Sequence, residues 1–133
     1  MQRILLAYDG GEPAQKALAL TADLAKHYGA TVSVLSVVPV HPGRTPIDPW
    51  DDREIHQREL LEAATKLREL GIEPELVESA GDPAKTIERV AADRQVDAVI
   101  VGSRGLNAIE RALQGSVSEH IATHAPTTVI VAR

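Results

Sequence analysis

Short runs rich in apolar residues alternate along the chain with longer stretches in which apolar residues recur every three or four positions. The short runs fall at residues 4–8, 31–38, 73–79, 97–101 and 127–132. Runs of this length, with many valines and isoleucines and few polar interruptions, are typical of strands that are buried on both faces. The stretches between them have the spacing of amphipathic helices. The pattern therefore predicts strands and helices in strict alternation, beginning and ending with a strand.

The first helix is predicted over residues 13–28, because Pro13 suits a first helical turn and Gly29 suits a helix end. Its smaller or apolar residues recur at helical spacing: Ala14, Ala17, Leu18, Thr21, Leu24, Ala25 and Tyr28. The segment from Pro39 to Asp52 holds four prolines and a glycine, so we expect an irregular loop within the domain and no domain boundary there.

The remaining helices are marked by similar signals. A second helix is predicted over 54–70, with Gly71 after its end and one apolar face made of Leu60, Leu61, Ala64 and Leu67. Asp82 followed by Pro83 predicts an N-cap and a third helix that reaches about Arg94. A fourth helix is expected between the last two strands. The whole order predicts an α/β fold, with a parallel sheet covered by helices on both faces in a single domain over 1–133.

Composition narrows the classes of protein to which the chain can belong. Phe is absent and the aromatic residues are Trp50, Tyr8 and Tyr28, so the core must be aliphatic. This scarcity and a formal net charge of −5 argue against nucleic-acid binding, which relies on basic surfaces and aromatic stacking. The absence of cysteine excludes disulfides and thiolate metal sites. No apolar stretch has the length of a membrane helix or a signal peptide, so we expect a cytoplasmic protein without membrane contact.

Two loops that contain glycine follow predicted strands. Asp9-Gly10-Gly11 follows the first strand, and Gly102-Ser103-Arg104-Gly105 follows the fourth. In open parallel sheets, ligands bind beyond the carboxyl ends of strands, where successive connections turn to opposite faces. Glycine lets the backbone approach a ligand closely, and free N–H groups at a helix N-terminus favour an anion. Both loops are therefore candidates for an anion-binding site.

The glycines after the fourth strand belong to a longer pattern. Neither G-x-x-x-x-G-K-[ST] nor G-x-G-x-x-G is present, but the chain contains Gly-x2-Gly-x9-Gly-Ser at Gly102, Gly105, Gly115 and Ser116. The nine-residue interval would let two separated backbone turns converge on one polyphosphate. A second interpretation needs no ligand, because Ser116 and Glu119 form a capping box and the glycines could be turn residues. The residues alone leave both interpretations open, and in an acidic chain a triphosphate would need Mg²⁺ and local help such as Arg104.

Several stretches together resemble the universal stress protein family, in its single-domain type. The resemblance runs through ILLAYDGGEPAQKAL, VSVLSVVP, DAVIVGSRG and GSVSEHIATHAPTTVIVAR, and it covers essentially the whole chain apart from the proline-rich loop. The Gly-x2-Gly-x9-Gly-Ser element is the signature of the family's ATP-binding branch. The resemblance implies a Rossmann-like, adenine nucleotide alpha hydrolase-like fold, whose five parallel strands have the order 3-2-1-4-5. It also implies an ATP-binding stress-response or regulatory protein.

The resemblance further implies which residues meet the nucleotide. Asp9 would lie at the adenine and ribose end, and the backbone of Val37 would meet the adenine edge. The full implied set is Ala7, Asp9, Val37, Val101, Gly102, Arg104, Gly105, Gly115, Ser116 and Val117. A homodimer through the last strand, Thr127 to Val131, is also implied, and it would protect an apolar edge. One departure is that many relatives have Asp-Gly-Ser or Asp-Phe-Ser where this chain has Asp9-Gly10-Gly11, so a hydroxyl near the first helix is missing.

Two other functions remain open. A slow ATPase or self-phosphorylating enzyme could use the hydroxyls of Ser103, Ser116 and Ser118, but phosphoryl transfer needs a positioned base and strong cationic stabilisation, so no catalytic residue is assigned. A dimeric interaction module could keep the fold without nucleotide, although the intact glycine motif argues against it. His120 and His124 are spaced i,i+4 without an evident third ligand, so no metal site is predicted.

Overall fold

A computed structural model describes residues 1–39, 49–102 and 127–132 of the chain. In these ranges the elements are β1 (Arg3–Ala7), α1 (Glu12–Tyr28), β2 (Thr31–Pro39), α2 (Pro49–Glu69), β3 (Glu75–Gly81), α3 (Pro83–Asp93), β4 (Ala98–Gly102) and β5 (Thr128–Ala132). All neighbouring strands are parallel, in the order β3-β2-β1-β4-β5. The predicted fold class and strand order are therefore confirmed. The predicted fourth helix lies outside the described residues.

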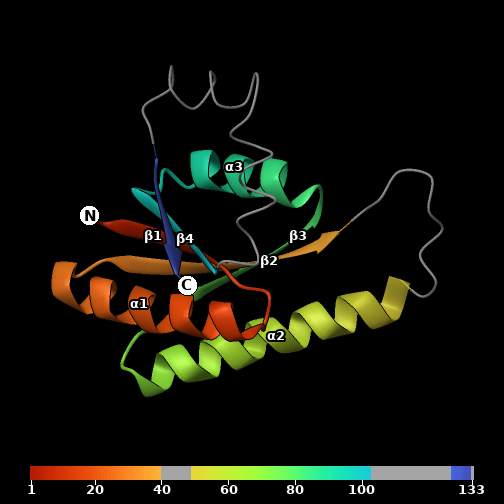
Figure 1. Cartoon of the computed structure of the whole chain (residues 1–133), viewed down its shortest axis with the longest axis horizontal. Helices are drawn as coiled ribbons and strands as arrows, with labels where there is room; N and C mark the ends of the chain where they lie inside the picture. Colours follow the sequence, from red (N-terminus) through yellow and green to blue (C-terminus); the bar gives the residue numbers. More distant parts are fainter. Residues whose placement is uncertain (40–48, 103–126, 133) are drawn as a thin grey trace.

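Helices cover both faces of this sheet. Figure 1 shows α1 and α2 together on one side and α3 on the other. The central strand β1 explains the arrangement, because Ile4 and Leu6 enter the cluster under α1 and α2, whereas Leu5 enters the cluster under α3. All three side chains are fully buried. The prediction of a first strand buried on both faces is thus confirmed.

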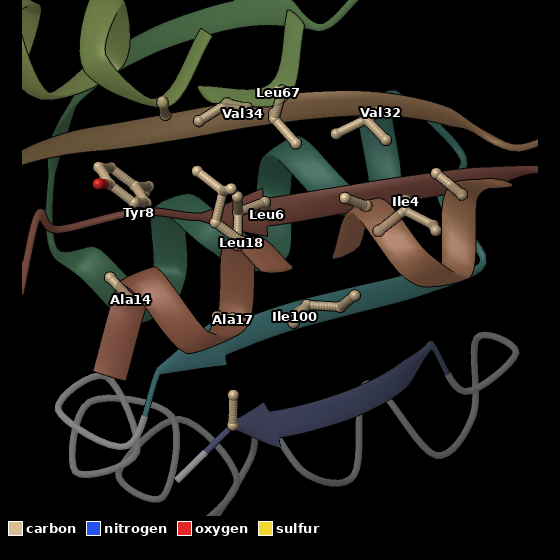
Figure 2. Packing of buried hydrophobic residues seen from close by; sticks show 14 of the residues in the cluster. Ile4, Leu6, Tyr8, Ala14, Ala17, Leu18, Val32, Val34, Leu67 and Ile100 are labelled. Carbon is tan, nitrogen blue, oxygen red and sulfur yellow. The ribbon is translucent and has the colours of Figure 1, made fainter. Parts of the chain in front are cut away.

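The helix α1 begins and ends at the residues that the sequence marks. Proline lies in its first turn, and Gly29 ends it in the left-handed conformation, with φ 65° and ψ 33°. Small residues let the helix approach the sheet closely: Ala14, Ala17, Ala22 and Ala25 are buried. Figure 2 shows Tyr8 at one end of this core, beside Ala14 of α1, and Ile4 at the other end. The predicted helix is confirmed, except that Tyr28 is exposed.

The helix α2 differs from the prediction in two respects. It begins at Pro49, so the last part of the expected loop, from Pro49 to Asp52, is helical. Proline fits a first helical turn as well as it fits a loop, which is why the pattern placed the start too late. Leu61 is 61% exposed and was wrongly placed on the apolar face. Residues at i, i+3, i+4 and i+7 share a face, and the buried set is Leu60, Ala63, Ala64 and Leu67.

The helix α3 has the predicted cap, because the Asp82 carboxylate accepts a hydrogen bond from the Lys85 backbone N–H at 3.1 Å. The strand β3 begins at Glu75, two residues after the predicted start at Glu73.

At the amino-terminal edge of the sheet, the Asp97 carboxylate accepts hydrogen bonds from the backbone N–H groups of Gln2 and Arg3, at 2.6 and 2.8 Å. These bonds hold the start of β1 beside the start of β4.

Candidate functional site

The carboxyl ends of three strands meet at one edge of the sheet. In the strand register, Ala7 of β1 lies opposite both Leu35 of β2 and Val101 of β4. Val37 follows Leu35 by two positions on the same strand. The structure therefore brings Ala7, Val37 and Val101, which the sequence predicted as nucleotide-binding residues, to a common edge. The strand order reverses at this edge, between β1 and β4, and ligands bind beyond the carboxyl ends of the strands at such a reversal in open α/β sheets.

The side chains at this edge belong mainly to the core. Val101 is 1% exposed and packs in the cluster under α3, and Ala7 and Val37 are partly buried against the same cluster. A ligand at the edge would therefore meet the backbone of Val101 and not its side chain.

The loop Asp9–Gly11 follows β1 and leads directly into α1. The Asp9 side chain is exposed, and one of its carboxylate oxygens accepts a hydrogen bond from the Gly11 N–H at 3.0 Å. Gly10 has φ +79°, a conformation that residues with a Cβ rarely adopt. Gly11 is the N-cap of α1 and provides no side-chain cap. The missing hydroxyl noted in the sequence thus leaves the first turn of α1 without a side-chain acceptor at that position. Because Pro13 has no N–H, the donors that this turn can offer an anion are the backbone N–H groups of Glu12 and Ala14.

Gly102 lies at the end of β4 and touches the first turn of α1. A Cβ on Gly102 would lie 2.6 Å from the Pro13 carbonyl carbon and 2.7 Å from the Ala14 nitrogen. No side chain can be placed at such distances without moving backbone. Gly102 therefore has a packing role that requires no ligand. Its position also brings the start of the glycine–serine motif to the amino end of α1.

A polar network, which the sequence did not predict, lies next to the Asp9–Gly11 loop between the end of β1, α1 and α2. The Gln15 side-chain amide donates to the Tyr8 hydroxyl at 2.6 Å and to Glu62 Oε1 at 3.1 Å, and the Tyr8 hydroxyl donates to Glu62 at 3.3 Å. Lys66 binds both Gln15 and Glu62. Burial, together with the negative charge of Glu62, raises the pKa of Tyr8 to about 12. The network joins the end of β1 to α1 and α2.

A second group lies between β2, α2 and the loop. Ser36 is fully buried, and its Oγ lies 3.0 Å from Nδ1 of His56 on α2. The same nitrogen lies 3.2 Å from Oε2 of Glu59, one helical turn further along α2. A polar Ser36 within an apolar strand was a usable sequence signal for this group. Nothing in the spacing of His56 and Glu59 distinguishes them from other polar residues of α2.

The rest of the predicted site lies outside the described residues. This applies to Arg104, Gly105, Gly115, Ser116 and Val117, and also to Glu119, His120 and His124. In the ranges that the structure describes, no three potential ligands among His, Asp and Glu gather as a metal site. The same ranges contain no helix that is long and apolar enough to cross a membrane.

A hollow of about 350 Å³ lies at the opposite, amino-terminal edge of the sheet, and its lining includes Arg3, Glu75 and Arg94. Arg94 Nη1 lies 2.6 Å from a carboxylate oxygen of Glu75, and this partner holds the pKa of the Glu75 carboxyl below its usual range. The Arg3 guanidinium donates to the Arg94 carbonyl oxygen at 3.2 Å. These cations are paired within the protein, and the hollow is remote from the loops that follow β1 and β4.

Comparison with known proteins supports the resemblance in the sequence. The model of the universal stress protein family matches residues 1–133. A universal stress protein of Thermus aquaticus is 32% identical over 139 residues, which cover 98% of this chain and 97% of the relative. Among solved structures, the universal stress protein from Archaeoglobus fulgidus in complex with dAMP is similar with a TM-score of 0.73 and 24% identity, covering 100% of this chain and 98% of the other. A universal stress protein family protein from Arabidopsis thaliana with AMP bound has a TM-score of 0.60 and 22% identity, covering 100% and 93%.

Proposed function

We propose that this chain, which belongs to the universal stress protein family, binds an adenine nucleotide at the carboxyl edge of its sheet and acts as a nucleotide-dependent stress-response or regulatory protein. The observation that carries the proposal is the contact between the end of β4 and the start of α1. Gly102, the first residue of the glycine–serine motif, touches the first turn of α1, directly after Asp9–Gly11. The dAMP and AMP complexes of proteins with the same fold support the choice of ligand.

The chemistry of the edge suits the two ends of a nucleotide. An exposed carboxylate such as Asp9 accepts hydrogen bonds from an amino or hydroxyl group, as adenine and ribose provide. The backbone N–H groups at the start of α1 favour a phosphate oxygen. Gly105, Gly115, Ser116 and Val117 are proposed, from the motif in the sequence, to bind the remaining phosphates. Because the Gly-x2-Gly-x9-Gly-Ser element resembles the signature of the family's ATP-binding branch, we propose ATP as the ligand.

Magnesium is proposed only as part of the bound nucleotide. Mg²⁺ commonly binds through one or two carboxylates together with phosphate oxygens and water. In the ranges 1–39, 49–102 and 127–132, no set of three side-chain ligands is available to hold the ion alone. The Mg²⁺–ATP complex is therefore the form that we expect to bind.

Two experiments test the proposal. Protein purified from cells should release adenine nucleotide when it is denatured by heat, and chromatography identifies whether this is AMP, ADP or ATP. Calorimetric titration of stripped protein with Mg²⁺–ATP should give saturable binding that Gly115→Val abolishes, because a β-branched side chain would prevent close approach of the backbone. If wild type and Gly115→Val both fail to bind at millimolar nucleotide, the proposal is wrong.

The assembly and location are also proposals. We propose a cytoplasmic, single-domain homodimer that forms through Thr127 to Val131. Its support is the strand order, which puts β5 at an edge of the sheet with β4 as its neighbour, and the exposed Val129 on that edge. An uncovered apolar edge strand favours pairing with another chain.

A further inference from the structure

The side chain of Glu59 occupies the space directly over Gly10. A Cβ on Gly10 would lie 3.1 Å from Cγ of Glu59, 3.2 Å from its Oε1 and 3.3 Å from its Cδ. Glu59 is on α2, whereas Gly10 is at the centre of the loop that carries Asp9. The helix α2 therefore touches the proposed nucleotide loop through this one carboxylate side chain, which packs where other residues would have a side chain of their own.

His56 holds Glu59 in this position. Nδ1 of His56 lies 3.2 Å from Glu59 Oε2 and 3.0 Å from the buried Ser36 Oγ. An ionised carboxylate can only accept hydrogen bonds, so with Glu59 ionised the shared nitrogen must carry the proton. The Ser36 Oγ is then a second acceptor of the same N–H, in a bifurcated hydrogen bond. The orientation of Glu59 is thus fixed from β2 through His56.

The surroundings of Glu59 are rich in negative charge. Among the described residues, the ionisable groups that face it are Asp9 from the loop, Tyr8 from the end of β1, and His56 and Glu62 from α2. Burial raises the pKa of the Glu59 carboxyl above its usual range, His56 opposes the rise, and the charges of Asp9 and Glu62 add to it. Ionisation of the Glu59 carboxyl is therefore less favourable than that of an exposed glutamate, and the group is in contact with a loop that is proposed to bind an anion.

We propose that Glu59 is a positioning residue for the nucleotide: held by His56, it packs against Gly10 and keeps the Asp9–Gly11 loop in its binding conformation. This inference rests on the proposed nucleotide function. It has an electrostatic consequence, because an anion bound beside the loop stabilises the protonated form of Glu59. Binding then takes up protons, and by linkage the affinity for nucleotide rises as the pH falls.

Two substitutions separate the packing of Glu59 from its charge. Glu59→Gln keeps the size of the side chain over Gly10 and removes the charge, whereas Glu59→Ala removes both. Mg²⁺–ATP is titrated calorimetrically into each variant and the wild type from about pH 8 down to about pH 4.5, near the ordinary pKa of a glutamate side chain. Because each variant is compared with wild type at the same pH, the titration of ATP itself affects both affinities equally and cancels from their ratio. Glu69→Ala, at the exposed carboxyl end of the same helix, is the matched control.

Glu59→Ala should bind about 5- to 10-fold more weakly than Glu59→Gln at every pH, as expected if the freed loop holds its binding conformation for roughly a tenth to a fifth of the time. Glu59→Gln should bind more tightly than wild type at the highest pH, and the difference should close as the pH falls. Glu69→Ala should match wild type.

Equal affinities of Glu59→Ala and Glu59→Gln would overturn the positioning role. A ratio of wild type to Glu59→Gln that does not change with pH would overturn its electrostatic consequence, and this second comparison uses the isosteric variant alone, so it holds even if Glu59→Ala does not fold. If wild type binds ATP saturably and one of these two contradicting results is found, only this inference is refuted and the proposed function stands. Failure of wild type to bind ATP at any pH refutes the proposed function itself.

Discussion

Gly102 at the end of β4 and Pro13 in the first turn of α1 are in backbone contact, because a Cβ on Gly102 would lie 2.6 Å from the Pro13 carbonyl carbon. This contact explains why a glycine is needed at Gly102 whether or not a ligand binds. It also fixes the end of β4 against the start of α1, two segments that are far apart in the sequence. A substitution here therefore tests packing first and binding second.

Gly102→Ala should lower the free energy of unfolding by about 1–3 kcal/mol, the usual range for overpacking a close-packed contact. Urea unfolding followed by circular dichroism measures the change. Gly29→Ala is the informative comparison, because a Cβ there meets no atom within 4 Å and its φ of +65° is the sole source of strain. If Gly102→Ala were as stable as wild type, the close approach of β4 and α1 would be incorrect.

Tyr8→Phe should destabilise the protein by about 0.5–1.5 kcal/mol at neutral pH, since it removes a hydroxyl that is bonded to Gln15 and Glu62. The pH dependence of the unfolding free energy in the alkaline range is a more specific test of this hydroxyl. The pKa of Tyr8 is about 10 in the unfolded chain and is raised to about 12 in the folded protein. The neutral phenol therefore stabilises the fold fully below about pH 10, and this contribution is lost as the pH rises to about 12. Unfolding free energies measured across that interval should fall more steeply for wild type than for Tyr8→Phe. Parallel curves would contradict the assignment.

Asp97→Asn should make the protein less stable at neutral pH and less sensitive to acid. Hydrogen bonds from the N–H groups of Gln2 and Arg3 hold the pKa of the Asp97 carboxyl below its usual range. The carboxylate therefore contributes stability above the unfolded-state pKa, and this contribution is lost as the pH falls through the lower, folded-state pKa. Chemical unfolding between about pH 6 and pH 2 measures it. Asp23→Asn, on the exposed face of α1, should leave the acid dependence of wild type unchanged.

Val129→Lys should convert the proposed dimer into a monomer, because the substitution puts a charge on the exposed edge of β5, and lysine on an edge strand opposes pairing. Size-exclusion chromatography with light scattering gives the mass directly. Leu61→Lys changes a more exposed apolar residue on α2 and should leave the dimer intact. A dimer that survives Val129→Lys and dissociates with Leu61→Lys would move the interface to α2.

The sequence predicts those features that depend on local pattern and topology. Consecutive apolar residues identified β1 and β4, and the alternation of elements placed the two loops at a common edge. The start of α2 was missed because Pro49 is compatible with both a loop and a first helical turn. Leu61 was misplaced because a leucine can lie on the exposed side of a helix without much penalty.

Contacts between side chains from different elements could not be predicted. Glu59 lies over Gly10 because α2 packs beside α1 on one face of the sheet. The separation between the Glu59 side chain and Gly10 is therefore a result of tertiary packing. In the sequence, Glu59 is one of several glutamates on a polar helix. The φ of Gly10 and the shared nitrogen of His56 are equally invisible until the helices are placed.

The position of β1 in the centre of the sheet has a consequence for synthesis of the chain. β1 is synthesised before the other strands of this sheet and pairs with β2 over Thr31–Leu35, but its other neighbour is β4, where Ala7 lies opposite Val101. One edge of this central strand therefore stays unpaired until β4 has been made. Unpaired strand edges promote aggregation, and pairings between distant residues form slowly. We expect the interval between completion of β2 and arrival of β4 to be the stage at which the nascent protein most needs a chaperone.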